Sequence, residues 1–198
     1  MHLFPADSFV PPRPTWLAQC LLRASIREGD LTLDATAGNG HDTVFLAECV
    51  GADGLVLAFD VQAEAIAAAR ARVADAGLAA RVEFFEESHA MMDARAAPGS
   101  VAAVMFNLGY LPGANHQVTT VTEGTLMGLE CATRLLTPGG LLSVICYPGH
   151  TGGAQEAAAV EQWFSRHAAG GWRVARYGWL GTRQPPPYLL LGAKPADM

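Results

Sequence analysis

The stretch LTLDATAGNGHDT, residues 31–43, decides the fold of this chain. Its apolar beginning ends at Asp34, two glycines follow at positions 38 and 40, and Asp42 comes directly before a run of mostly apolar residues. A buried strand that leads through a glycine-rich turn into a helix has this pattern. Glycines in such a turn let the backbone come close to a ligand. We therefore expect a strand, a ligand-binding turn and a helix over about residues 42–50.

The same alternation continues along the chain. Short apolar runs typical of strands alternate five times with segments that have helical spacing, and the last two strands have no convincing helix between them. This predicts an α/β fold with a mostly parallel seven-stranded sheet, helices on both faces and a late antiparallel hairpin. A turn at residues 137–140 is expected to separate a helix from the strand that follows it. The expected helices are 16–26, 42–50, 63–77, 119–136 and 155–167, and the expected strands are 31–36, 55–59, 81–89, 100–113, 141–150, 172–180 and 187–194.

The bulk composition fits one domain. A chain of 198 residues with 51% apolar residues is long enough for one substantial core. Residues 1–15 are proline-rich and are expected to form an N-terminal arm, and residues 16–198 the single domain. The four cysteines stand far apart with no C-x-x-C pair, so neither a zinc site nor a redox pair is predicted. No apolar run reaches the roughly 18 residues of a membrane span and no signal peptide is recognisable, so we expect a cytoplasmic protein that binds no metal and no membrane.

The charge is spread unevenly. The formal net charge is -6, and residues 1–94 carry 6 basic and 14 acidic side chains while residues 95–198 carry 7 basic and 5 acidic ones. An acidic first half suits a cationic ligand, and the second half tolerates a polyanion. Neither half has a dense charge run, so solvated surfaces explain the pattern equally well.

Unusual polar residues follow successive predicted strands. In open α/β sheets, ligands bind at the carboxyl ends of the strands, where the strand order reverses. A structural protein has no reason to collect polar residues along that edge, so we expect a ligand site there. The residues in question are Asp34 and the glycine turn, then Asp60, Glu87-Ser88-His89, Asn107 to Pro112, and Tyr147 to His150.

The acids beside the glycines favour a cationic nucleoside ligand. A dinucleotide site prefers G-x-G-x-x-G and has no acid in the turn to repel the pyrophosphate. Here Asp34 and Asp42 bracket the glycines, which suits the ammonium and sulfonium groups of S-adenosylmethionine. Asp60, about 20 residues further on, is placed to accept both ribose hydroxyls, a role shared by NAD and S-adenosylmethionine sites. The turn therefore favours S-adenosylmethionine and keeps NAD as the alternative.

Each of these residues also has a purely structural interpretation. Gly38 and Gly40 are compatible with an ordinary turn, Asp42 with a helix N-cap, and Asn107 with an Asx-turn. A loop histidine is usually solvated or part of a structural hydrogen bond, and this applies to all four candidates. The joint occurrence of these residues at successive strand ends is what favours a ligand site. The histidines are His41, His89, His116 and His150.

The motifs at the strand ends closely resemble those of the MnmM (YtqB-like) family of class I methyltransferases. They are DATAGNGHDT, AFDVQ, ESH, NLGYLPG and YPGH-x-GG-x-x-E, and the resemblance spans roughly residues 28–194. It implies a Rossmann-like class I methyltransferase fold and S-adenosylmethionine as cofactor. This rRNA methylase-like family includes tRNA 5-(aminomethyl)-2-thiouridine methyltransferases. The segment TRQPPPY, residues 182–188, departs from the family's Asn- and Pro-rich late segment.

The resemblance also implies roles for single residues. Asn107 accepts hydrogen bonds from the neutral acceptor amine, Tyr110 stacks on the base, and His89 and His150 are candidate general bases. The amine can also lose its proton to bulk water on binding. The candidate catalytic residues are Asn107, Tyr110, His89 and His150, and the candidate cofactor-binding residues are Asp34, Thr36, Gly38, Asn39, Gly40, Asp42, Thr43, Asp60, Gln62, Glu87, Ser88, His89 and Asn107.

The expected substrate is the wobble uridine in a tRNA anticodon loop, where unstacked bases can be read. Five scattered arginines in the second half are candidates for phosphate contacts, although such a number is ordinary for a surface. The alternatives are an rRNA or small-molecule methyltransferase on the same scaffold, or a non-catalytic module that binds S-adenosylmethionine. The oligomeric state stays open, with a homodimer as one option. The arginines are Arg134, Arg166, Arg173, Arg176 and Arg183.

Overall fold

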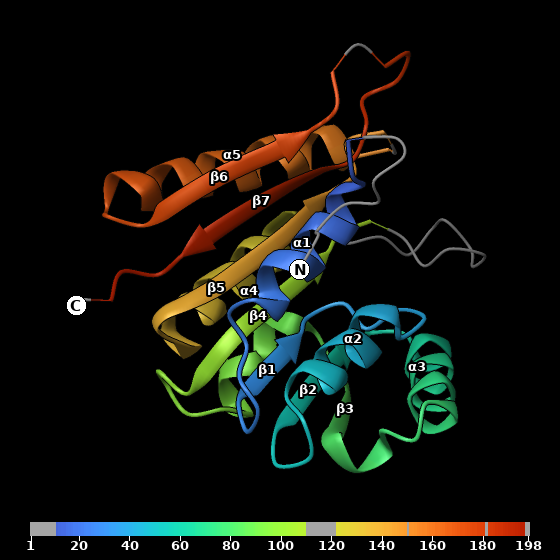
Figure 1. The fold of residues 1–198 in the computed structure, drawn as a ribbon. Helices are drawn as coiled ribbons and strands as arrows, with labels where there is room; N and C mark the ends of the chain where they lie inside the picture. The colour runs from blue at the N-terminus through green and yellow to red at the C-terminus, as the bar shows by residue number, and fades with distance from the viewer. Residues whose placement is uncertain (1–10, 110–121, 150, 181, 197–198) are drawn as a thin grey trace.

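The computed structural model contains one seven-stranded sheet with helices on both faces (Figure 1). It describes residues 11–109, 122–149, 151–180 and 182–196. The strands lie in the order β3-β2-β1-β4-β5-β7-β6. Strands β1 to β5 pair in parallel, and β7 is antiparallel to both β5 and β6. The predicted fold class is confirmed. The strands are β1 (Leu31–Asp34), β2 (Leu55–Asp60), β3 (Val82–Glu86), β4 (Val101–Asn107), β5 (Leu136–Cys146), β6 (Arg173–Gly178) and β7 (Tyr188–Ala193).

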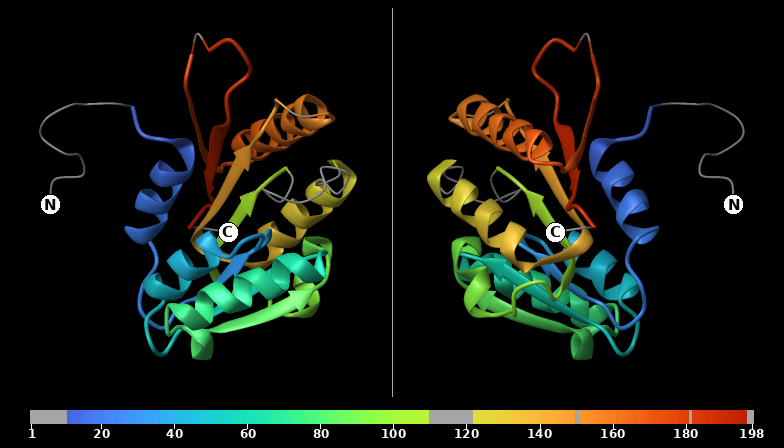
Figure 2. Two further views of the ribbon diagram at one scale, coloured as in Figure 1. Left: turned by 90° about the vertical axis from the view of Figure 1, so that its right-hand side faces the viewer. Right: turned by 90° about the vertical axis from the view of Figure 1, so that its left-hand side faces the viewer.

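Two helical layers enclose the sheet (Figure 2). Helices α1, α2 and α3 cover one face, because their buried residues pack with Val56, Ala58, Ala103 and Met105 of the strands, and Ala18 packs with Ile145. Helices α4 and α5 cover the other face. Alternate residues of each strand point to opposite faces, so both layers bury apolar surface from water. The helices are α1 (Pro14–Arg23), α2 (His41–Cys49), α3 (Ala63–Asp75), α4 (Thr122–Leu135) and α5 (Gly153–Ala169), with 3-10 turns η1 (Ala79–Arg81) and η2 (His89–Ala94).

Two elements differ from the expected boundaries near the chain start and at β5. Helix α1 begins at Pro14, inside the predicted arm, because proline at the first helical position has no N–H to leave unpaired. Strand β5 begins at Leu136, directly after α4, so the expected turn at 137–140 is part of the strand. The backbone of Gly139 and Gly140 bonds to Lys194 at 3.0 Å in each direction, and the pairing of β5 with β4 shifts register there. The registers with β4 and β7 both skip residues 137–140, and Gly139 has φ +79°, so the predicted turn is present as an irregularity at the start of β5.

The third strand is shorter than expected. It ends at Glu86, and residues His89–Ala94 form the 3-10 turn η2 instead of extending the strand. The Ser88 side chain caps this turn, since its Oγ accepts the Ala90 N–H at 3.2 Å. The late hairpin of β6 and β7, without a helix between them, is confirmed. None of the helices in the described ranges is long and apolar enough to cross a membrane.

Candidate active site

The strand order reverses between β1 and β4, and the polar residues gather at that edge of the sheet. The helix after β1 covers one face, while α4, which follows β4 along the chain, covers the other. The connections from the two strands therefore leave toward opposite faces, and ligands of such sheets usually bind in the crevice outside the carboxyl ends of these strands. Asp34, Asp60 and Asn107 are the last residues of β1, β2 and β4.

Helix α3 packs against the glycine turn. Gly40 is the N-cap of α2 with φ +79°, and a Cβ at this position would stand 2.7 Å from the Cα of Ala69. Both its backbone conformation and the close approach of α3 therefore require glycine. The Arg72 side chain donates from Nε to the carbonyl of Asn39 at 2.6 Å. The predicted turn residues Gly38, Asn39 and Gly40 thus follow one fixed path along the edge of the crevice.

Asp34 is a buried carboxylate with two local donors. One oxygen accepts the Thr36 N–H at 3.1 Å and the other accepts the Thr43 hydroxyl at 2.6 Å. The pKa of Asp34 is raised to about 7 in all: burial is the largest cause, the negative charges of Asp42 and Asp60 also raise the pKa, and the two hydrogen bonds lower it. A cation bound here would relieve this repulsion. The acids of the turn therefore have the electrostatics predicted for a positively charged ligand.

Asp60 accepts two backbone hydrogen bonds at the end of β2. Its oxygens accept the N–H groups of Gly38 at 2.9 Å and Gln62 at 3.0 Å. Gln62 is also the N-cap residue of α3. A carboxylate has about four acceptor positions, so two remain for a ligand. Asp60 therefore joins the glycine turn to the start of α3 and keeps acceptor capacity for a pair of hydroxyl groups.

Asn107 and Asp42 meet across the crevice. The Asn107 side chain donates from Nδ2 to Asp42 Oδ2 at 3.2 Å, and its backbone N–H donates to the Thr36 hydroxyl at 2.7 Å. The other oxygen of Asp42 accepts a hydrogen bond from Gln19 Nε2 of α1 at 2.8 Å. Since a carboxylate can only accept, the NH₂ group of Asn107 must face Asp42. The carbonyl oxygen Oδ1 of Asn107 is therefore directed away from Asp42.

Tyr147 adds a hydroxyl beside Asn107. It follows β5 directly and is partly buried. Burial raises the pKa of the Tyr147 hydroxyl, as does the charge of Asp42, and a hydrogen bond with the Asn107 side chain lowers it. The hydroxyl thus stays protonated at neutral pH and remains able to donate. Sequence reasoning placed Tyr147 in a strand-end motif but gave it no role.

The three predicted residues after β3 make different contacts. Both carboxylate oxygens of Glu87 are paired with the Arg95 guanidinium, and Ser88 caps η2. The ring of His89 packs edge-on against Phe106, and its Nδ1 lies 3.2 Å from the Ala35 carbonyl. Burial lowers the pKa of His89, while backbone hydrogen bonds to Ala35 and Gly124 raise it. These contacts favour a positioning role for His89, and its role as a base stays a prediction.

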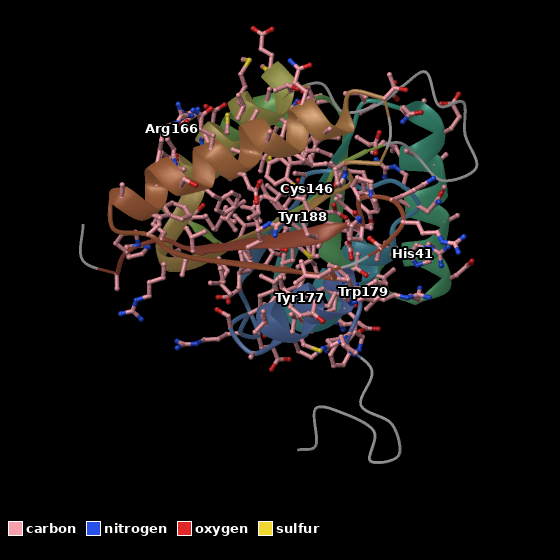
Figure 3. All side chains as sticks on the ribbon, turned by 90° about the horizontal axis from the view of Figure 1, so that it is seen from above. His41, Cys146, Arg166, Tyr177, Trp179 and Tyr188 are labelled. Carbon is pink, nitrogen blue, oxygen red and sulfur yellow. The ribbon has the colours of Figure 1, made fainter. Side chains whose placement is uncertain are left out.

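Other predicted residues lie outside the described ranges or away from the crevice. Tyr110, His116 and His150 are outside the described residues. Helices α4 and α5 cross from the carboxyl to the amino edge of the sheet, so Arg134 and Arg166 near their ends lie far from the carboxyl ends of the strands. Figure 3 shows Arg166 far from His41, the first residue of α2 after the glycine turn. Arg134 is paired with Asp93 as well. Among the described residues no group of three His, Cys, Asp or Glu side chains could hold a metal ion.

Sequence reasoning missed Gln19 as well as the role of Tyr147. Gln19 lies in α1, which contacts α2, β5 and β7 across the sheet face. Its partner Asp42 is 23 residues away along the chain, and the next link, Asn107, is a further 65 residues away. No local motif surrounds Gln19, so only the packed fold reveals its position.

Known proteins resemble this chain over most of its length. Residues 56–192 match the family model described as "Putative rRNA methylase". A chloroplastic tRNA (mnm(5)s(2)U34)-methyltransferase of Arabidopsis thaliana is 34% identical, over 90% of this chain and 69% of the relative. The crystal structure of a "putative rRNA-methylase" from Clostridium thermocellum has a TM-score of 0.89 and 35% identity, over 94% of this chain and all of that one. A "putative methyltransferase" from Streptococcus mutans, solved in complex with SAH, has a TM-score of 0.84 and 30% identity, over 93% and 99% of the two chains.

Proposed function

This chain belongs to the rRNA methylase family, and from that premise we propose that it methylates the aminomethyl nitrogen of a 5-aminomethyl-(2-thio)uridine at the wobble position of tRNA. The enzyme class and the cofactor follow from the family itself: the chain is an S-adenosylmethionine-dependent methyltransferase. The acceptor is the proposed part, because one fold and one cofactor serve many acceptors. Its support comes from the geometry around Asn107 and from the activity named for the Arabidopsis relative.

The residues at the β1 and β2 ends fit the cofactor. When bound, S-adenosylmethionine supplies an electrophilic methyl group on a positively charged sulfur. Asp34, Asp42 and Asp60 lie near enough to one another that the charges of the other two raise the pKa of Asp34. The two open acceptor positions of Asp60 suit the two ribose hydroxyls. We refer to the ends of β1 and β2 as the cofactor side of the site.

The orientation of the Asn107 amide carries the proposal for the acceptor. Because its NH₂ group is bound to Asp42, its carbonyl oxygen is the atom presented to an acceptor group. A carbonyl oxygen accepts a hydrogen bond from an N–H, so it can hold a neutral amine with the nitrogen lone pair directed at the methyl carbon. We refer to the ends of β4 and β5, with Asn107 and Tyr147, as the acceptor side.

The transfer then requires alignment and the loss of one proton. The amine nitrogen forms a bond to the methyl carbon as the carbon–sulfur bond breaks, and the electron pair of that bond stays on sulfur. An aminomethyl group is mostly protonated in neutral water, so a proton leaves it before attack. In this proposal Asn107 stabilises the neutral amine, and Tyr147 keeps the Asn107 side chain in place by accepting a hydrogen bond from its NH₂ group. The roles of Tyr110 on the base and of His150 as a base remain predictions from the family resemblance.

Binding of the RNA should depend on few positive charges. Of the five arginines considered above, Arg183 belongs to the connection between β6 and β7, which lies at the same edge of the sheet as the site. Arg176 is paired with Glu161 and stacks on Tyr188. Because so few phosphates can be neutralised, the affinity for tRNA should be modest and should fall at higher salt.

The test is methyl transfer from labelled S-adenosylmethionine to three RNAs in parallel. They are tRNA that carries the aminomethyl group, the unmodified transcript of the same tRNA, and ribosomal RNA. We expect label in the modified tRNA alone, since a site built to bond an N–H discriminates strongly against an acceptor without one. Label in ribosomal RNA but not in the modified tRNA would overturn the proposed substrate and leave the enzyme class unchanged.

A further inference from the structure

We infer that Gln19 of helix α1 is a positioning residue for the acceptor side, acting through Asp42 on Asn107. Gln19 Nε2 lies 2.8 Å from Asp42 Oδ1, and Asn107 Nδ2 lies 3.2 Å from Asp42 Oδ2. The three side chains come from α1, α2 and β4 and form one continuous chain of hydrogen bonds. The inference rests on the proposed function for what Asn107 does, and it adds the group that fixes the Asn107 amide.

Asp42 determines the orientation of the Asn107 amide. It lies in the first turn of α2 and is only 9% exposed, so water has little access to its carboxylate. Each of its two oxygens has one side-chain partner, Gln19 on one side and Asn107 on the other. If the Asn107 amide turned over, its carbonyl oxygen would face the carboxylate and repel it. A fixed carboxylate therefore fixes which atom Asn107 presents to the acceptor.

Helix α1 is anchored well enough to hold Gln19 in place. Pro14, Ala18 and Leu22 recur at every fourth position and are all buried, so one stripe of the helix faces the sheet. Ala18 packs with Ile145 of β5 and Leu189 of β7. Gln19 is the next residue along the helix and is partly buried. Its position is therefore set by the packing of α1 on the two strands that border the acceptor side.

The amide is suited to this role because it carries no charge. The charge of Asp42 raises the pKa of Asp34 of β1 and of Tyr147 after β5. The arginine of α1, Arg23, is paired with Glu48. Gln19 orients the carboxylate while leaving its negative charge available for the cationic cofactor. A lysine or arginine at position 19 would orient Asp42 but would neutralise that charge.

The first test separates positioning from cofactor binding. We expect Gln19→Ala to lower kcat on the modified tRNA about tenfold, the size of one charge-assisted hydrogen bond, with the Kd for S-adenosylmethionine changed less than about threefold. Gln162→Ala, an exposed glutamine of α5, is the matched control and should behave as the native enzyme. Native-like kcat in Gln19→Ala, at equal thermal stability, would overturn the inference.

The second test uses charge. In Gln19→Glu two carboxylates face each other, and below neutral pH they share one proton that restores the hydrogen bond. The kcat of this variant relative to native enzyme should therefore rise as the pH falls from about 9 to about 6. Loss of folding alone would give no such recovery, so a flat ratio across this pH range contradicts the role of Gln19.

The third test needs no substrate. The ¹⁵N–¹H signals of the Asn107 side-chain NH₂ should shift and broaden in Gln19→Ala but not in Gln162→Ala, because the amide loses its fixed acceptor. If this change is seen while the native enzyme fails to methylate modified tRNA, the proposed substrate is wrong and the positioning role stands. If the native enzyme is active and the Asn107 signals do not change in Gln19→Ala, the positioning role is wrong and the proposed function stands.

Discussion

The cofactor side and the acceptor side of this site are assembled by different kinds of contact. On the cofactor side, Asp34 and Asp60 accept hydrogen bonds from backbone groups of the adjoining turns and from one nearby hydroxyl. On the acceptor side, Asn107 is held by side chains of distant elements, namely Thr36 and Asp42. Backbone donors tolerate changes in the surrounding side chains, whereas a chain of side chains depends on each member. Substitutions should therefore affect cofactor binding on one side and turnover on the other.

The largest effect is expected from Asp60→Ala, which probes the cofactor side. Two ribose hydroxyls bound to a charged acceptor contribute about 1.5–3 kcal/mol each. We expect the Kd for S-adenosylmethionine, measured by calorimetry, to rise at least about 100-fold. Asp53→Ala, an exposed acid before β2, should leave the Kd unchanged. An unaltered Kd in Asp60→Ala would show that the ribose lies elsewhere and would remove the basis for the comparison.

Asn107→Ala probes the acceptor side. The variant should lose roughly 100-fold in kcat, since it removes a group that aligns the acceptor, while the Kd for S-adenosylmethionine stays within about threefold of native. Single-turnover rates with the modified tRNA, alongside cofactor calorimetry, measure both quantities. If the affinity for S-adenosylmethionine fell in parallel with turnover, the cofactor side and the acceptor side would not be functionally separate.

Asp34→Asn tests the electrostatics of the buried acid. The pKa of Asp34 is raised from 3.8 to about 7 in the folded protein. Between these values the folded state holds a proton that the unfolded state has released, so the stability of the cofactor-free protein should fall as pH rises from about 4 to about 7. The change is on the order of a few kcal/mol. Urea unfolding at several pH values should show that the free energy of unfolding depends less on pH in Asp34→Asn than in the native protein. The same pH dependence in both proteins would contradict the raised pKa of Asp34.

The smallest effect is expected from Arg72→Ala. Its guanidinium is exposed and supports the glycine turn through the Asn39 carbonyl alone. An exposed hydrogen bond of this kind contributes little, so the Kd for S-adenosylmethionine should rise only about threefold. Arg70→Ala, on the same helix, is the control, because its side chain bonds to the Phe84 carbonyl of β3. A loss as large as that of Asp60→Ala would mean that the turn depends on the Arg72 hydrogen bond for its path.

The same division explains what the sequence could predict. Asp34, the glycines and Asp60 belong to two recognisable sequence motifs, and they bond to each other or to neighbouring residues of these motifs. The strand, the turn and the cofactor class could therefore be inferred from the sequence. The family confirms the cofactor class. The early start of β5 could not, because Gly139 and Gly140 pair with Lys194 more than 50 residues away. Gln19 could not either, since its role exists only after α1 packs on β5 and β7. The assignment of single residues to cofactor and acceptor remains a prediction.

The three carboxylates of the cofactor side also affect how readily the demethylated cofactor leaves the enzyme after each cycle. Asp34, Asp42 and Asp60 repel one another while the crevice holds no cation. S-adenosylmethionine brings the sulfonium charge that offsets this repulsion, and the transfer of the methyl group leaves a neutral thioether. The spent molecule is therefore held by one fewer favourable charge interaction than the molecule that entered. We expect the acidic turn to favour exchange of product for fresh cofactor, and so to limit product inhibition.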